Sequence, residues 1–470
     1  MIRLLKSVFL FFTLTICFCH FAFGQTNTEY DIVLIGGRVI DPETKLDAIK
    51  NVGIINNRIV QISSEQLKGK QTINVSGLVV APGFIDLHVH GLTNIEQEYQ
   101  LHDGLTTALE LEGGIENLKE WYTTRHSKAL INYGASVCWP CERFKAIDKH
   151  KDDVQLTADE LNKTLDNIKS SLSEGGIGIG VPIGYFPKTN PKEMYRVFQL
   201  AGELNVLVFT HVRNPDIISI QEVIADAALT NAPLHIVHIN SITLGNIQLG
   251  LDMVKAAQKK GIDITTELYP YTAGSTGLQS AMFSDGWQDR LGISYSDLQC
   301  VATGERLTKE TFDAYRKTGG WVIIHVMKPE WIKIGIAAPG VIIASDGMPY
   351  SKLAHPRTGG TFSRVLGKYV REEKVIDLMT AIEKMTLLPA KRLENIAPMM
   401  RFKGRIQIGA DADITIFNPN TIIDKGTFEN GPAFSEGIEY VIVNGVVVLR
   451  NGKTVANVFA GQPIYGKYKN

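Results

Sequence analysis

Short apolar runs recur along the middle of the chain, and stretches with helical spacing separate them. The clearest runs are residues 79–87, 206–210, 234–237 and 341–345. Short apolar runs predict buried strands. Residues 157–173 have the pattern of a helix, and a strand-like run follows at residues 178–181. Strands that alternate with helices favour a parallel α/β barrel.

The two ends of the chain have a different pattern. Residues 31–80 and 404–460 contain short strand-like runs with turn residues between them, and Asn444-Gly445 is a good hairpin signal. We therefore expect residues 25–81 and 399–470 to build one small β-sandwich domain that flanks the barrel.

The barrel is expected to span residues 82–398. Its seventh and eighth strands are separated by an unusually long stretch at about residues 283–340. Loops at the C-terminal ends of barrel strands surround the active site in barrel enzymes. We interpret the stretch as an insertion over the mouth of the barrel.

Residues 1–24 have the features of a secretory signal peptide. A basic start is followed by an almost wholly apolar stretch at residues 8–23, with small residues near its end. We expect cleavage before Gln25 and a periplasmic or secreted protein. An uncleaved membrane anchor is the alternative, and a lipoprotein modified at Cys17 or Cys19 fits less well because bulky residues precede both cysteines.

The net charge bears on the classes of partner to expect, and the cysteines bear on disulfide formation. The net charge is −1 and becomes −3 without the basic leader, which gives no reason to expect nucleic acid as a partner. No later segment has about eighteen uninterrupted apolar residues, so no stable membrane insertion is expected after cleavage. Cys138 and Cys141 could form a local disulfide in an exported protein or remain free thiols. The sequence predicts no particular oligomeric state.

Histidines and one aspartate stand at the ends of several apolar runs. His88 and His90 close the first run, and residues two apart on a strand point to the same side. His211, His238 and Asp346 each follow a later run. Two imidazoles that project together can share a metal ion, and imidazole suits zinc. We expect the five side chains to meet at the C-terminal end of the barrel.

Longer motifs connect the chain with a known family. They are residues 210–213 (Thr-His-Val-Arg), 269–276 (Tyr-Pro-Tyr-Thr-Ala-Gly-Ser-Thr), 345–347 (Ser-Asp-Gly) and 355–367, which begins His-Pro-Arg-Thr-Gly-Gly. From about residue 30 onward, the chain resembles the amidohydrolase superfamily and, within it, the D-aminoacylases (N-acyl-D-amino-acid deacylases). The resemblance implies a (β/α)8 TIM-type barrel that hydrolyses the amide bond of small N-acyl-D-amino acids.

The resemblance also implies a metal centre with one or two Zn²⁺ ions or other divalent metals. Its ligands would be His88, His90, His211 and His238. Asp346 would be the general base, which accepts a proton from water activated by the metal and passes it to the leaving amine.

The bridging ligand departs from the family pattern. Related enzymes use a carboxylated lysine on the fourth strand or a cysteine after a Thr-Thr run, and this chain has neither. Glu110 and Glu112 follow its Thr-Thr run and share one strand face. Glu112 is the expected bridge because it is nearer the strand end, and Glu110 is the second candidate. Alternatively, the buried glutamate pairs with an arginine such as Arg143. Whether one or two metals bind stays open.

Substrate contacts are expected from residues that match the family motifs. Arg357 and Tyr271 would hold the α-carboxylate, because guanidinium groups bind carboxylates through paired hydrogen bonds. Asn240 replaces a lysine of the relatives in the same pocket. Weaker candidates are Arg213, Ser275 and Arg290, the last of which could meet the side chain of an N-acyl-D-glutamate. His235 and His325 match no family ligand and are left as structural or supporting residues.

Two other functions compete with this one. A cyclic amidase of the dihydroorotase or hydantoinase type is disfavoured by the 355–367 motif and by the missing fourth-strand lysine. A catalytically inactive binding protein is disfavoured because four histidines and Asp346 are all present.

Overall fold

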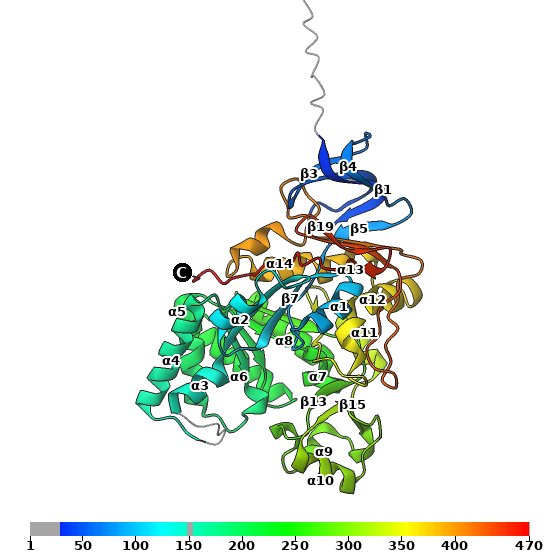
Figure 1. Cartoon of the computed structure of the whole chain (residues 1–470). Coiled ribbons are helices and arrows are strands. Elements are labelled where there is room, and N and C mark those ends of the chain that lie inside the picture. The colour runs from blue at the N-terminus through cyan, green and yellow to red at the C-terminus, as the bar shows by residue number, and fades with distance from the viewer. Residues whose placement is uncertain (1–28, 148–153, 470) are drawn as a thin grey trace, which may run out of the picture.

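The computed structural model describes residues 29–147 and 154–469, so the predicted signal peptide lies outside the described residues. Figure 1 shows a central barrel, a β-rich domain beside one end of it and a small insert at the other. No helix in the described ranges is both long and apolar enough to cross a membrane.

Eight parallel strands form the barrel, and their order in the sheet follows their order along the chain. They are β6 (Phe84–Asp86), β7 (Leu105–Ile115), β8 (Asn132–Cys138), β9 (Ile179–Pro182), β10 (Val208–His211), β11 (Leu234–Ile236), β12 (Ile264–Leu268) and β16 (Ile342–Ile343). A parallel bridge between Val89 and Gly347 joins the first and last strands just beyond their ends. The predicted TIM-type barrel is confirmed.

Helices cover the outside of the barrel, most of them between successive strands and α12 to α14 after the last strand. They are α1 (Asn94–His102), α2 (Leu118–Arg125), α3 (Trp139–Ile147), α4 (Ala158–Ser173), α5 (Pro191–Leu204), α6 (Ile217–Thr230), α7 (Ile239–Thr243), α8 (Ile247–Lys259), α11 (Pro329–Ala337), α12 (Thr361–Arg364), α13 (Leu378–Met385) and α14 (Leu387–Leu393). The helix predicted at residues 157–173 is α4, with Thr157 and Glu160 forming a capping box.

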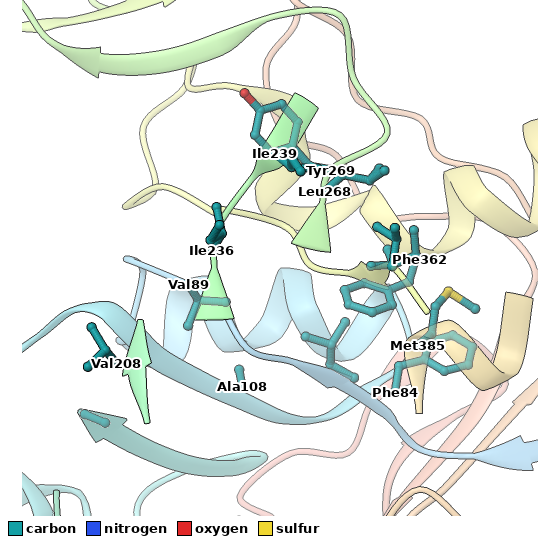
Figure 2. Packing of buried hydrophobic residues seen from close by; sticks show 14 of the residues in the cluster. Phe84, Val89, Ala108, Val208, Ile236, Ile239, Leu268, Tyr269, Phe362 and Met385 are labelled. Carbon is teal, nitrogen blue, oxygen red and sulfur yellow. The ribbon is translucent and has the colours of Figure 1, made fainter. Parts of the chain in front are cut away.

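Apolar side chains from strands and helices meet in the main core. Figure 2 shows Phe84, Phe362 and Met385 packed together, and Phe84 stacks on Phe362 at a centroid distance of 5.7 Å. Ile236, Val208 and Ala108 come from neighbouring strands of the same core. This packing fixes the strand ends from which the polar residues project.

The β-rich domain contains strands from both ends of the chain. Its strands are β1 (Tyr30–Asp41), β2 (Leu46–Ile55), β3 (Arg58–Ser63), β4 (Gly69–Asn74), β5 (Val79–Pro82), β17 (Ile414–Phe417), β18 (Ile438–Val443), β19 (Val446–Arg450) and β20 (Lys453–Thr454). They form one hydrogen-bonded sheet of nine strands, where a sandwich of two halves was expected, because β17 pairs directly with β5. Asn444-Gly445 is the turn of the hairpin β18–β19.

The apolar run at residues 79–87 serves both sheets. The sequence predicts one strand there, but Gly83 divides it into β5 of the β-rich domain and β6 of the barrel. A side chain at Gly83 would overlap Thr106, since its Cβ would lie 2.1 Å from the Thr106 hydroxyl. The first barrel strand is therefore continuous with the β-rich domain through a position that only glycine fills.

The insert is a separate small unit between β12 and β16. It contains the three-stranded sheet β13 (Gly274–Gly277), β15 (Trp321–Ile324) and β14 (Leu298–Cys300), the helices α9 (Trp287–Leu291) and α10 (Lys309–Thr318), and its own apolar core. Its sheet begins before residue 283, where the sequence analysis placed the start. The expected end at residue 340 is also too late, because α11 packs against the barrel helices α7 and α8.

A long connection of the β-rich domain, residues 418–437, reaches the insert, and we call it the strap (Figure 1). The strap's Phe428 ring lies 5.2 Å from the His355 ring and 4.9 Å from the His325 ring. Gln299 of the insert donates a hydrogen bond of 2.7 Å to the Phe428 carbonyl. Asp424 of the strap pairs with Arg364 of α12 at 2.7 Å. The strap therefore joins the β-rich domain, the insert and the loop that contains His355.

Cys138 and Cys141 form a disulfide where β8 ends and α3 begins. The sequence left two alternatives, a disulfide or free thiols, and the structure contains the disulfide. Cys300 of the insert is buried and free.

A buried polar junction fixes the β-rich domain to the barrel. The Asp413 carboxylate accepts hydrogen bonds of 2.6 Å from Lys403, 2.9 Å from the Asn132 side chain on β8 and 2.6 Å from the Asn444 backbone. The C-terminal residues near Ile464 then lie against β8, whereas the sequence analysis assigned them to the β-rich domain.

We expect Asp413→Ala to destabilise the protein by about 3 kcal/mol, because it leaves Lys403 buried with half of its counter-charge and two donors unpaired. The thermal midpoint by calorimetry measures the effect. Asp313→Ala, which breaks an exposed pair with Lys309, is the control and should cost below about 1 kcal/mol. Equal shifts in the two variants would contradict the role of the junction.

Candidate metal centre

His88, His90 and Asp346 form the first half of the site, at the ends of β6 and β16. The Nε2 atoms of His88 and His90 lie 3.2 Å apart. Asp346 Oδ1 lies 3.5 Å from His88 Nε2 and 3.4 Å from His90 Nε2. Three ligand atoms at such distances can surround one cation.

Glu112, His211 and His238 form the second half. Glu112 Oε1 lies 2.9 Å from His211 Nδ1 and 3.6 Å from His238 Nε2. Its other oxygen, Oε2, lies 3.3 Å from His88 Nε2 and 3.1 Å from His90 Nε2. The two oxygens of one carboxylate thus face the two halves, which is the arrangement that a bridging ligand requires.

A β-bulge points Glu112 into the barrel. The pairing of β7 with β8 shifts between Glu110 and Ile115, so the intervening residues leave the regular ladder. Burial disfavours the ionised form of Glu112, but hydrogen bonds from the surrounding imidazoles hold its pKa well below the ordinary value. Arg143, the alternative partner, instead pairs with Glu193 at 3.0 Å.

Two further carboxylates orient the first pair of histidines. Glu110 Oε2 lies 2.9 Å from His90 Nδ1, so Glu110 contacts one of these histidines and lies outside both groups of three ligand side chains. Glu267, at the end of β12, lies 2.6 Å from His88 Nδ1 through one oxygen and 3.0 Å from His235 Nε2 through the other. A carboxylate behind a ligating imidazole fixes the ring and its tautomer.

Glu267 was not identified from the sequence. The sequence signal for Glu267 was a charged residue in a strand-like run shortly before the Tyr-Pro-Tyr motif. Burial raises the pKa of a carboxyl, but the His88 and His235 imidazoles lower that of Glu267 to about 2. His235 therefore supports the site through Glu267, one of the two roles that the sequence left open for it. His325 lies in the insert and hydrogen-bonds Gln299.

Arg357 pairs with Asp346. Its Nη1 lies 2.9 Å from Asp346 Oδ2, and its guanidinium carbon lies 4.6 Å above the Tyr269 ring. Asp346 and His238 both have positive φ angles, 51° and 31°, a strained conformation that the surrounding packing maintains. The carboxylate is therefore held between the histidines on one side and a buried cation on the other.

A cavity of about 60 Å³ opens beside the metal-ligand set. Polar groups face it from Tyr185, Ser241, Tyr269, Ser275 and Thr276. His211, His238 and Asp346 also line it, and the apolar part of its wall includes Ile242, Met282, Leu291, Ile324 and Val326. Tyr185, whose ring lies 5.1 Å from that of His211, and Tyr269 were not among the residues expected from the sequence.

Several predicted substrate residues lie elsewhere. Tyr271 does not line this cavity and hydrogen-bonds Asp424 of the strap at 3.3 Å, so Tyr269 is the tyrosine of that motif that faces the site. Asn240 is fully buried and donates to the Tyr269 carbonyl at 3.1 Å. Arg357 is also fully buried behind Asp346. A substrate could contact Tyr271, Asn240 or Arg357 only if the residues that cover these side chains moved.

The two outer arginines are held by protein groups. Arg213 pairs with Glu222 at 2.6 Å and donates to the carbonyls of Pro187 and Thr189. Arg290 donates to carbonyls of its own loop, including that of Asp285 at 2.7 Å. Both line a neighbouring cavity of about 210 Å³ that shares the His211 wall. Ser275 is the predicted contact that lies on the wall of the inner cavity.

The donor set fits divalent metal ions. Four imidazoles and two carboxylates are ligands that zinc accepts, and their atoms fall into two groups of three, each within 4.8 Å. A parallel barrel with such groups at the C-terminal ends of its strands defines a class, the metal-dependent barrel hydrolases.

Comparison with known proteins shows which family the chain resembles. The model of the amidohydrolase family matches residues 251–449. The D-aminoacylase of Alcaligenes xylosoxydans xylosoxydans is 28% identical over 90% of this chain and 96% of its own length. The N-acyl-D-glutamate deacylase of the same organism is 27% identical over 89% and 94%. Dihydroorotase of Geotalea daltonii matches at 24% over 89% and 99%.

A solved structure agrees in fold. N-acyl-D-glutamate deacylase from Bordetella bronchiseptica, complexed with zinc and a phosphonate inhibitor, superimposes with a TM-score of 0.83 at 24% identity, over 93% of this chain and 100% of that one. The chain is therefore similar to the amidohydrolase family and, over most of its length, to D-aminoacylases and N-acyl-D-glutamate deacylases.

The bridging position can be tested by substitution. We expect Glu112→Gln to lower metal affinity by more than a hundredfold, because an amide is a poor anionic bridge. Glu110→Gln removes only a partner of His90 and should cost about ten- to a hundredfold. Metal content by mass spectrometry and competition with a chelator measure both. A larger loss in Glu110→Gln would exchange the two assignments.

Proposed function

We propose that the protein is a metal-dependent deacylase that hydrolyses the amide bond of N-acyl-D-amino acids. The observation that carries the proposal is the Glu112 carboxylate between two histidine-containing groups, with Asp346 facing the same space. Zinc is the proposed metal, as one or two ions, because imidazole and carboxylate ligands suit it.

The chain's own residues define the rest of the chemistry. A divalent cation bound by these ligands would polarise the amide carbonyl and lower the pKa of a water molecule. The Asp346 carboxylate accepts the proton of the attacking water and delivers it to the leaving nitrogen. Burial raises the pKa of Asp346, but Arg357 and His88 hold it below the ordinary value, so the group is ionised and able to accept a proton at neutral pH.

Tyr185 and Tyr269 both have a phenolic hydroxyl and line the catalytic cavity. Burial raises the pKa of Tyr269 to about 12, so its hydroxyl keeps the proton at neutral pH. Burial raises the pKa of Tyr185 as well, so both hydroxyls can donate hydrogen bonds to a carbonyl oxygen or a carboxylate.

The group proposed to bind the α-carboxylate of the substrate is the Arg357 guanidinium. Apart from the ion pair with Asp346, no guanidinium nitrogen of Arg357 makes a well-formed hydrogen bond among the described residues. Buried donors of this kind are normally satisfied, so an anion that reaches them would be held strongly. Because Arg290 is engaged by its own loop and the inner wall is apolar, we favour an uncharged amino-acid side chain over glutamate.

We also propose that the protein is exported to the periplasm or secreted. The apolar stretch at residues 8–23 after a basic start supports this, and the disulfide Cys138–Cys141 is a bond that persists in oxidising compartments.

A substrate screen of the metal-loaded protein tests the function. We expect hydrolysis of N-acetyl-D-leucine and N-acetyl-D-alanine, loss of activity after chelation and recovery when zinc is restored. N-acetyl-D-glutamate, the L enantiomers, dihydroorotate and hydantoins are the comparison substrates. Preference for a cyclic amide would favour the dihydroorotase or hydantoinase alternative, and full activity in protein shown to be metal-free would reject the mechanism.

Asp346→Asn tests the general base. The amide keeps the size of the side chain but removes the proton acceptor, so kcat should fall by about a hundred- to ten-thousand-fold while the four imidazoles still bind metal. Metal content and circular dichroism are measured alongside the rate. A variant with nearly normal kcat would exclude Asp346 from proton transfer.

A further inference from the structure

A second cavity, of about 110 Å³, lies next to the catalytic one, between the insert and the loop after β16. Ser275 belongs to the walls of both cavities. On the barrel side the wall begins with Met348, two residues after Asp346, and continues through Tyr350. The insert contributes Trp321 from the start of β15, a strand that Figure 1 shows where the insert meets the barrel.

Two exposed aromatic rings stand at this second cavity. Trp321 is 47% exposed and Tyr350 is 40% exposed, so both residues present apolar surface that a ligand can cover. The Tyr350 ring stacks on Tyr99 at 5.2 Å, and the main chain at Trp321 is fixed by a hydrogen bond of 2.9 Å from the Val301 backbone to the Trp321 carbonyl. A ring held by stacking, as that of Tyr350 is, loses little entropy when a ligand binds.

The chemistry of the wall selects an uncharged group. None of its lining residues is ionisable at neutral pH, and Val301, Met348, Pro349 and Ala354 supply apolar surface. Thioether sulfur and aromatic rings both make favourable contacts with an aromatic group. The buried Ser351 hydroxyl has no hydrogen-bond partner among the described residues, so one polar atom of a ligand can also be satisfied.

We propose that the cavity between Trp321 and Tyr350 binds an aromatic group of the substrate, remote from the amide that is cleaved. The inference rests on the proposed deacylase function and extends it to substrates with two apolar substituents, one on each side of Ser275. The aromatic group could belong to the acyl part or to the amino-acid side chain, and both present the same chemistry to the cavity.

Three substrates separate these sources: N-acetyl-D-alanine, N-phenylacetyl-D-alanine and N-acetyl-D-phenylalanine. We expect one aromatic substrate to exceed N-acetyl-D-alanine in kcat/KM by about tenfold or more in the wild-type enzyme, from stacking and burial of the ring. Trp321→Ala and Tyr350→Ala should remove most of that advantage while leaving N-acetyl-D-alanine turnover within about twofold. Trp321→Phe and Tyr350→Phe keep a ring and should retain it.

Phe459→Ala, which removes an exposed ring that lines neither cavity, is the control and should change nothing. The substrate whose advantage is lost identifies the acyl group or the side chain as the occupant. No advantage for either aromatic substrate, or equal losses on all three substrates, would overturn the inference while the deacylase function stands. If the wild-type enzyme hydrolyses none of the three, the proposed function fails. Calorimetric binding of N-phenylacetyl-D-alanine to wild type, lost in Trp321→Ala, would then support the cavity, and unchanged binding would reject it.

Discussion

The structure depends on one electrostatic constraint, the burial of six ligand side chains within a few ångströms of one another at the end of the barrel. Charges and unpaired polar groups are costly inside a protein unless partners surround them. Glu112 meets this requirement by placing one oxygen toward each histidine-containing half. A metal ion in either half would supply the remaining positive charge, which is why we expect stability as well as activity to depend on metal.

A layer of supporting contacts surrounds this centre. Glu267 and Glu110 fix the rings of His88 and His90, and Arg357 faces Asp346 from the opposite side. Each supporting residue comes from a different part of the chain, so the barrel must be complete before the ligands are aligned. Outside this layer the character changes: the cavity wall is mostly apolar, and the nearby arginines are engaged by the protein itself.

Much of this arrangement could be predicted from the sequence because it is local. His88 and His90 share a strand face through their spacing, and the departure from the family pattern singled out Glu112 in advance. Contacts between distant segments could not be predicted. The pairing of Arg357 with Asp346, the position of Tyr269 in place of Tyr271, and the strap that places Phe428 beside His355 all depend on how separate elements pack. The extent of the insert was misjudged for the same reason, since α11 has an ordinary helical pattern and only its packing assigns it to the barrel.

The single β-rich sheet has a consequence for how the chain acquires its shape. β5 obtains its second neighbour only from β17, which begins at Ile414. A chain that emerges N-terminus first, from a ribosome or a translocation channel, therefore carries strands β1 to β5 with an open edge until almost all of it has appeared. Open strand edges are templates for association with other chains. The order of the strands therefore keeps one edge of the N-terminal strands available to other chains during most of synthesis.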